Sequence, residues 1–181
     1  MSSYEIVFSV PEDRIGVFIG KKGETKRMLE NSLGVKIKID TQDSKVIFIL
    51  DHEDPLKEVK IQDIMDAISH GFSPEVSLNL LDDRYVLYKI NLREIYGKNN
   101  KKTITRYKGR VIGEKGSFKR KIEEYTDTNI SIYDDYIYII GKLEDVLTAK
   151  EGIEMILQGA KHSSVISFFE KKAFEKNLML R

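Results

Sequence analysis

Alternating apolar and polar residues predict the first secondary-structure elements of the chain. Ile6, Phe8 and Val10 alternate with polar or exposed-type neighbours, which predicts a strand over residues 4–10. The same period of two recurs over residues 35–39, and residues 46–50 form a short apolar run typical of a buried strand. The first fifty residues therefore contain three candidate strands.

Helix signals lie between and after these strands. Pro11 followed by two acidic residues is expected to open a short helix that ends at Gly20, and a second helix over residues 24–33 is expected to end at Gly34. A longer helix starts at Pro55 and is closed by Gly71. Its expected buried stripe consists of Val59, Ile61, Ile64, Met65 and Ile68.

The second half of the chain repeats this order. Residues 84–91 are expected to form a strand, and residues 96–103 an inserted loop rich in Asn and Lys. The remaining predicted elements are a short helix near residues 105–112, a helix over 117–125, a hairpin of strands 129–133 and 136–140, and a helix from 143 to about 158. Each half is followed by one further helix, expected over residues 72–81 and 163–175.

The two halves also match residue by residue. Gly16–Gly23 and Gly109–Gly116 both read G-x-[F/V]-I-G-x-K-G. Aligned without gaps, residues 14–40 and 107–133 share ten identities in 27 positions, which indicates an internal duplication. The identical pairs include Lys26/Lys119, Arg27/Arg120, Glu30/Glu123, Ile37/Ile130 and Ile39/Ile132.

Composition narrows the possible functions. The 181 residues are 41% hydrophobic and 33% charged, as in a globular protein with a strongly charged surface. The chain has no Cys, which excludes disulfides and thiol catalysis, and its three His residues are widely spaced. Neither a secretory signal nor a run of about 20 apolar residues is present, so a cytoplasmic location is expected.

Charge is unevenly distributed along the chain. The net charge is only +1, but residues 98–121 carry +9 and residues 14–38 carry +5, whereas the remainder carries −13. Both basic segments contain one of the duplicated glycine motifs. Two local basic segments in an otherwise acidic protein favour directed contact with a polyanion.

A paired glycine motif suits a phosphate backbone. Because Gly has no side chain, a phosphate can come close to main-chain N–H groups, and the helix that follows each motif adds its positive end. The order strand, helix, GxxG, helix, strand, strand, helix resembles the type I KH domain. The resemblance implies an α+β fold of two such domains, each a three-stranded antiparallel sheet backed by three helices and followed by an appended helix. We expect the domains to span residues 1–81 and 82–181.

The KH resemblance also implies the RNA-contacting residues. KH loops clamp about four nucleotides of backbone, and the bases lie on an apolar groove bordered by the next strand. Val35, Ile39 and Ile132 are further candidates for this groove. The implied site residues are Ile19, Gly20, Lys21, Lys22, Gly23, Lys26, Arg27 and Ile37 in the first domain, and Lys108, Arg110, Ile112, Gly113, Glu114, Lys115, Gly116, Lys119, Arg120 and Ile130 in the second. Neither a metal site nor a cofactor is predicted.

Taken over its whole length, the chain is similar to the archaeal members of the Dim and partner-of-Nob family of ribosome-assembly factors. The resemblance rests on two KH units in about 180 residues and on Lys108–Lys119, which compares with the K-G-R-x-I-G run of that family. It implies binding near the 3′ end of small-subunit ribosomal RNA. It also implies partnership with the endonuclease that trims this end and with the α subunit of archaeal initiation factor two. Glu114 departs from a purely basic loop and weakens the local chemistry of the second motif.

Three other functions are alternatives to RNA binding, and the sequence argues against two of them. A protein-interaction scaffold or translation-associated adaptor could use the same domains without reading RNA sequence. An exosome-type subunit would need a β-barrel, for which the duplication leaves no room. An enzyme would need converging catalytic groups, but the acidic pairs lie in expected turns, and the chain has no P-loop. We therefore predict a non-catalytic protein.

The motif glycines suggest simple tests. We expect Asp at Gly20 or at Gly113 to block phosphate approach while the fold is retained. The larger charge of the second segment predicts that the second loop is the stronger anchor.

Overall fold

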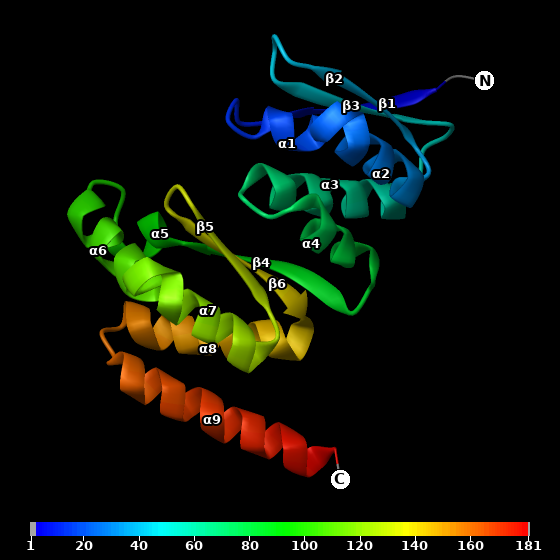
Figure 1. Cartoon of the computed structure of the whole chain (residues 1–181). Coiled ribbons are helices and arrows are strands. Elements are labelled where there is room, and N and C mark those ends of the chain that lie inside the picture. Colours follow the sequence, from blue (N-terminus) through cyan, green and yellow to red (C-terminus); the bar gives the residue numbers. More distant parts are fainter. Residues whose placement is uncertain (1–2, 181) are drawn as a thin grey trace. The chain divides into compact units, whose positions relative to one another are not determined.

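The computed structural model describes residues 3–180, which form two compact units that divide between Asp82 and Asp83. The units are described separately. The predicted α+β fold with a three-stranded antiparallel sheet in each half is confirmed (Figure 1).

The first unit follows the predicted order closely. Its elements are β1 (Tyr4–Ser9), α1 (Ile15–Ile19), the 3-10 turn η1 (Lys21–Gly23), α2 (Glu24–Leu33), β2 (Lys36–Asp40), β3 (Lys45–Leu50), α3 (Pro55–Ser69), α4 (Pro74–Leu78) and η2 (Asn79–Leu81). The strands run antiparallel in the order β1-β3-β2, with Ile37 opposite Phe48. The helix start at α1 is later than expected, because Pro11 and the next residues form a turn.

The second unit has the same core order with additions. Its elements are β4 (Tyr85–Asn91), α5 (Leu92–Tyr96), α6 (Lys101–Ile112), η3 (Glu114–Gly116), α7 (Ser117–Thr126), β5 (Asn129–Tyr133), β6 (Tyr136–Lys142), α8 (Leu143–Leu157) and α9 (His162–Met179). Its sheet order, β4-β6-β5, reproduces that of the first unit, and Ile130 lies opposite Ile139 as Ile37 lies opposite Phe48.

Local sequence explains where the first unit's helices begin and end. The Asp54 carboxylate accepts a hydrogen bond from the Lys57 N–H at 3.1 Å and caps α3, whose first residue is Pro55. Ser73 caps α4 in the same way through the Val76 N–H. Gly34 ends α2 in the left-handed conformation, as expected for a glycine at this position.

The inserted loop is shorter than the predicted range 96–103 and comprises only residues 97–100. Tyr96 ends the short helix α5, and α6 already begins at Lys101. Side-chain contacts outweigh the polar sequence here: the rings of Tyr96 and Tyr107 stack with centroids 4.8 Å apart. The Tyr96 hydroxyl also donates to the Leu157 carbonyl at 2.6 Å. Burial raises the pKa of Tyr96, so the phenol remains a neutral donor.

The predicted stripe of α3 is correct except at its first member. Ile61, Ile64, Met65 and Ile68 are at most 2% exposed, but Val59 is 59% exposed. On this helix the buried face is therefore narrower than the run of apolar residues suggests.

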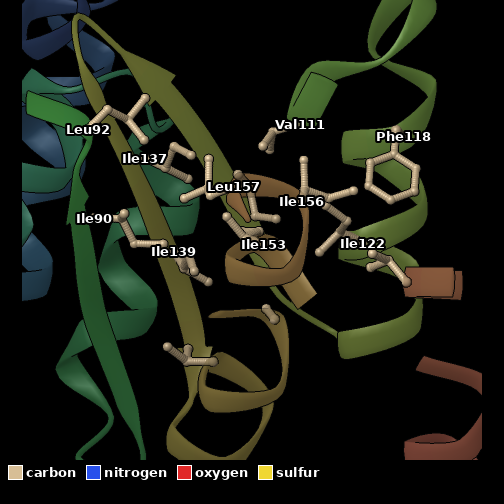
Figure 2. Packing of buried hydrophobic residues seen from close by; sticks show 14 of the residues in the cluster. Ile90, Leu92, Val111, Phe118, Ile122, Ile137, Ile139, Ile153, Ile156 and Leu157 are labelled. Carbon is tan, nitrogen blue, oxygen red and sulfur yellow. The ribbon is translucent and has the colours of Figure 1, made fainter. Parts of the chain in front are cut away.

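The last helix, α9, is an integral part of the core of the second unit. Figure 1 shows α9 on the side of α8 that faces away from the sheet, and Figure 2 shows the core side chains that α7, α8 and the strands contribute. Val165 and Phe169 of α9 are at most 1% exposed and belong to this cluster. The Phe169 ring fills the space above Gly152 of α8, where even one methyl group would clash with it. Lys176 donates to Asp145 at 2.6 Å and fixes the far end of the helix.

Removal of the buried Phe169 ring should therefore make the second unit less stable. We predict that Phe169→Ala lowers the free energy of unfolding by about 3–5 kcal/mol, the usual cost of removing a buried Phe. The matched control is Phe174→Ala on the same helix, where the ring is 65% exposed and the expected change is below about 0.5 kcal/mol. Urea unfolding followed by circular dichroism measures both. Equal losses would mean that α9 is only loosely attached.

Candidate nucleic-acid interface

The two GxxG loops have the same backbone conformation. Gly20, Lys22 and Gly23 have φ of 69°, 53° and 74°. The matching residues Gly113, Lys115 and Gly116 have φ of 73°, 50° and 75°. Three of the four loop positions thus lie at positive φ in each copy, two of them glycines, for which this region is unstrained. The duplication is preserved in the backbone to within a few degrees.

The first glycine of each loop tolerates no side chain. At Gly20, a Cβ atom would lie 2.8 Å from the backbone N of Thr25; at Gly113, it would lie 2.8 Å from the backbone N of Phe118. Both glycines also have a ψ of 177°. A positive φ combined with ψ near 180° is a backbone conformation that essentially only Gly adopts, so a side chain here is excluded for a second reason. The expectation that Asp at Gly20 or Gly113 leaves the fold undisturbed is therefore wrong. The close approach between each loop and the helix after it depends on these glycines.

A glutamate in each unit fixes the edge strand beside the loop. The Ile37 N–H donates to the Glu30 carboxylate at 2.8 Å, and the Ile130 N–H donates to Glu123 at 2.8 Å. Each carboxylate also faces the lysine one turn earlier on its helix, Lys119 at 3.1 Å from Glu123 and Lys26 at 3.9 Å from Glu30. The sequence showed these residues as identities of the repeat, but their role as a helix-to-strand tether was not recognised.

Two of the isoleucines predicted for the groove lie in the core. Ile37 is 2% exposed and Ile130 is 3% exposed. Ile19 and Ile112, next to the loops, are half-buried, as are Val35, Ile39 and Ile132. The half-buried residues leave apolar surface available to a base, whereas RNA contact by Ile37 and Ile130 stays a prediction with almost no exposed surface behind it.

A hollow of about 850 Å³ lies between α2 and β2 of the first unit. Val35 and Ile37 contribute to its wall, and Lys26, Lys36 and Lys38 supply positive charge. Lys36 and Lys38 were not among the predicted site residues, although their alternation with Ile37 and Ile39 was visible in the sequence.

In the second unit, a hollow of about 700 Å³ borders Gly113 and Ser117. There the His162 ring stacks on Phe118 with centroids 3.8 Å apart.

Several predicted RNA-contacting cations already have partners within the protein. Lys108 donates to the Asp134 carbonyl at 2.7 Å. Arg110 donates to the carbonyls of Ile156 and Ala160 at 3.3 and 2.5 Å, so it ties α6 to the end of α8. In the first unit, Arg14 precedes α1 and donates to the carbonyls of Ile68 and Phe72, both at 2.9 Å. It thereby ties the start of α1 to the end of α3.

Other predicted cations are exposed at the loops. Lys21 and Lys22 in the first loop and Lys115 in the second loop are exposed to solvent, as is Glu114. Arg120 reaches back from α7 and donates to the Lys115 carbonyl at 2.8 Å, which braces the second loop. The loops therefore present lysine side chains next to closely approachable backbone, the arrangement that a phosphate group requires.

Among residues 3–180, no group of three or more His, Asp and Glu side chains is placed to hold a metal ion. The helices of this described part include none that is long and apolar enough to cross a bilayer.

Comparison with known proteins agrees with this geometry. The profile of the eukaryotic type KH domain (KH domain type I) matches residues 87–174, and a general KH-domain profile matches residues 5–65. The chain is 42% identical over 167 residues to the KH domain-containing protein MJ0443 of Methanocaldococcus jannaschii, a match that covers 92% of this chain and 73% of the relative. The chain belongs to the family of Dim2 and PNO1 proteins. The family resemblance inferred from the sequence is therefore confirmed, as is the assignment of both units to the type I KH fold.

Further members of the Dim2/PNO1 family connect this fold with ribosomal RNA. A crystal structure of a complex of a/eIF2α, aDim2p and rRNA from Pyrococcus horikoshii contains a chain with 36% identity and a TM-score of 0.82, with 96% of each chain covered. The pre-rRNA-processing protein pno1 of Aspergillus oryzae is 28% identical over 116 residues, which cover 63% of this chain and 44% of that protein.

The close approach at Gly113 can be tested with alanine. We predict that Gly113→Ala destabilises the second unit, by about 1–3 kcal/mol from strained backbone conformation alone. Gly109→Ala is the matched control: it lies on the exposed face of α6 with nothing within 4 Å of the new Cβ. There, alanine should stabilise the helix by about 0.5–1 kcal/mol. Thermal unfolding measures both, and equal effects of the two substitutions would refute the close approach.

Proposed function

We propose that this protein is a non-catalytic RNA-binding factor of ribosome biogenesis, which holds single-stranded ribosomal RNA with its two KH units. The observation that carries the proposal is the pair of GxxG loops with identical backbone conformation, each opening a helix and each beside exposed lysines. Loops of this kind bind the backbone of about four unpaired nucleotides. The relatives named for pre-rRNA processing and for an rRNA complex support the same role.

The finer parts of the proposal rest on family resemblance. We place the binding site on the RNA near the 3′ end of small-subunit rRNA. The α subunit of initiation factor two is the proposed protein partner, supported by its presence in the complex with the Pyrococcus relative. The endonuclease that trims the rRNA 3′ end, and a cytoplasmic location, stay predictions from the sequence.

Charge reversal in each loop tests the proposal. Lys22 and Lys115 have φ near 50°, a conformation that Asp accepts more readily than most residues, so Lys→Asp leaves the loop shape intact. We predict that Lys115→Asp weakens single-stranded RNA binding about tenfold and Lys22→Asp less, since the second unit carries the stronger positive field. Fluorescence anisotropy with a labelled 12-nucleotide RNA measures the affinities.

The matched control is Lys171→Asp, an exposed position on α9 with the same change in charge. This variant should bind RNA within about twofold of the unaltered protein. If all three variants lose affinity equally, binding is governed by net charge and the loops are not the site. A larger loss from Lys22→Asp would make the first unit the principal anchor.

Salt dependence distinguishes RNA binding from an apolar protein interface. For about five phosphate contacts on a single strand, log affinity should fall against log salt with a slope near −3.5.

Single-stranded RNA should also compete better than a duplex of equal length, because the groove accommodates unpaired bases. A slope near zero, or equal competition by the duplex, would favour the scaffold function instead.

A further inference from the structure

The second unit has a basic extension that the first unit lacks. In the first unit, the chain passes from β1 to α1 through a short turn containing Glu12 and Asp13. In the second unit, α5 and two additional turns of α6 are inserted at the same place. The inserted segment, residues 92–107, has five basic side chains and one acidic side chain, Glu94.

One face of α6 leads directly to the second loop. Lys102, Arg106, Gly109 and Gly113 are spaced by four, three and four residues, so they lie along one side of the helix. The first three are exposed, while Ile104 and Val111 on the opposite side are at most 1% exposed. At 1.5 Å per residue, this stripe covers about 16 Å from Lys102 to the loop. Lys98 and Lys101 lie at its far end, and all of these cations are exposed.

The lysines of this extension differ from the neighbouring basic residues, because their side chains have no partner among the described residues. Within the described residues 3–180, the side chains of Lys98, Lys101 and Lys102 form no hydrogen bond or ion pair. By contrast, Lys108 and Arg110 are bound to backbone carbonyls. Arg106 lies over the Tyr107 ring, 4.9 Å from its centre.

The position of the lysines is also unfavourable for the helix itself. Lys101 and Lys102 occupy the first turn of α6, where the helix dipole is positive and acidic residues are preferred. No acidic residue is present in that turn. A locally unfavourable charge placement that nothing inside the unit compensates is expected at functional surfaces.

The extension is nevertheless firmly held. Figure 1 shows α5 and the start of α6 at the end of the second sheet where the β5–β6 turn lies. Arg93 of α5 donates to Asp135 in that turn at 2.6 Å, and Lys108 lies 3.6 Å from the same carboxylate. The bond from Arg93 lowers the pKa of Asp135, so the pair stays charged at neutral pH. Together with the stacked Tyr96 and Tyr107, this pair holds the backbone of the extension that carries the lysines.

We infer that the exposed stripe of α6 with Lys98 and Lys101 binds the phosphate backbone of the RNA segment that adjoins the four nucleotides held at the second GxxG loop. The inference rests on the proposed function and extends it, because the second unit would bind a longer stretch of RNA than the first. If stacked nucleotides advance about 3.4 Å each, 16 Å corresponds to about five additional nucleotides. RNA is favoured over an acidic protein because the stripe leads along one side of α6 to the second GxxG loop, where Lys115 is exposed.

RNA length provides the test. The triple variant K98Q/K101Q/K102Q removes three charges and keeps residues of equal helix propensity. The control K142Q/K161Q/K171Q removes three exposed lysines elsewhere in the same unit. Affinities of the full chain are measured for oligouridylates of 5 and 12 nucleotides. We expect the triple variant to lose about tenfold for the 12-mer and less than twofold for the 5-mer, with the salt slope for the 12-mer reduced by about 2, or 0.7 per lost contact.

Each outcome is decisive. Equal losses for both lengths, or the same loss in the control, would reduce the stripe to general electrostatic attraction and overturn the inference. Unchanged affinity for both lengths would overturn it as well, and an acidic protein partner would then become the better candidate. If the unaltered protein binds neither oligonucleotide, the proposed function itself fails. Because the substitutions relieve an unfavourable helix start, the melting temperature should not fall, so lost binding cannot be assigned to unfolding.

Discussion

The absence of a side chain at two glycines is the constraint on which the rest of the site depends. At Gly20 and Gly113, the loop passes so close to the next helix that a Cβ atom would lie 2.8 Å from a backbone nitrogen. This contact sets the direction of α2 and α7, and it leaves the backbone of each loop open to a phosphate. The glutamate tethers from Glu30 and Glu123 then fix the adjoining strands relative to these helices. Loop, helix and strand edge therefore form one preorganised unit in each half.

The basic residues divide into two groups with different roles. Arg14 and Arg110 donate to backbone carbonyls at helix ends, and Lys108 donates to a carbonyl in the β5–β6 turn, so these three cations have structural roles. Lys22, Lys115 and the lysines of the α6 stripe remain exposed, and their charges are free to act on a ligand. Net charge along the sequence does not separate the groups, because a cation that satisfies a carbonyl counts the same as one that faces solvent. The field available to RNA is thus more local than the segment totals of +9 and +5 suggest.

Sequence reasoning worked where local chemistry decides the structure. The duplicated motif, the alternation of the strands and Gly34 specified the order of elements and the loops with little ambiguity. It failed where contacts between distant residues decide. The helical start of α6 depends on Tyr96 stacking against Tyr107, and the burial of Ile37 and exposure of Val59 depend on which faces the sheet and helices cover. The role of Glu30 and Glu123 could have been suspected from their identity in the repeat, but its geometry needed the fold.

The central claim is that RNA phosphate is held at the backbone of the two loops. Backbone amide resonances of the ¹⁵N-labelled protein, followed during titration with a 12-nucleotide single-stranded RNA, test it most directly. The account predicts that the largest shifts fall on residues 20–24 and 113–117, with smaller shifts on the α6 stripe. Largest shifts on α9 or on the exposed side of α3, with the loops unchanged, would contradict it.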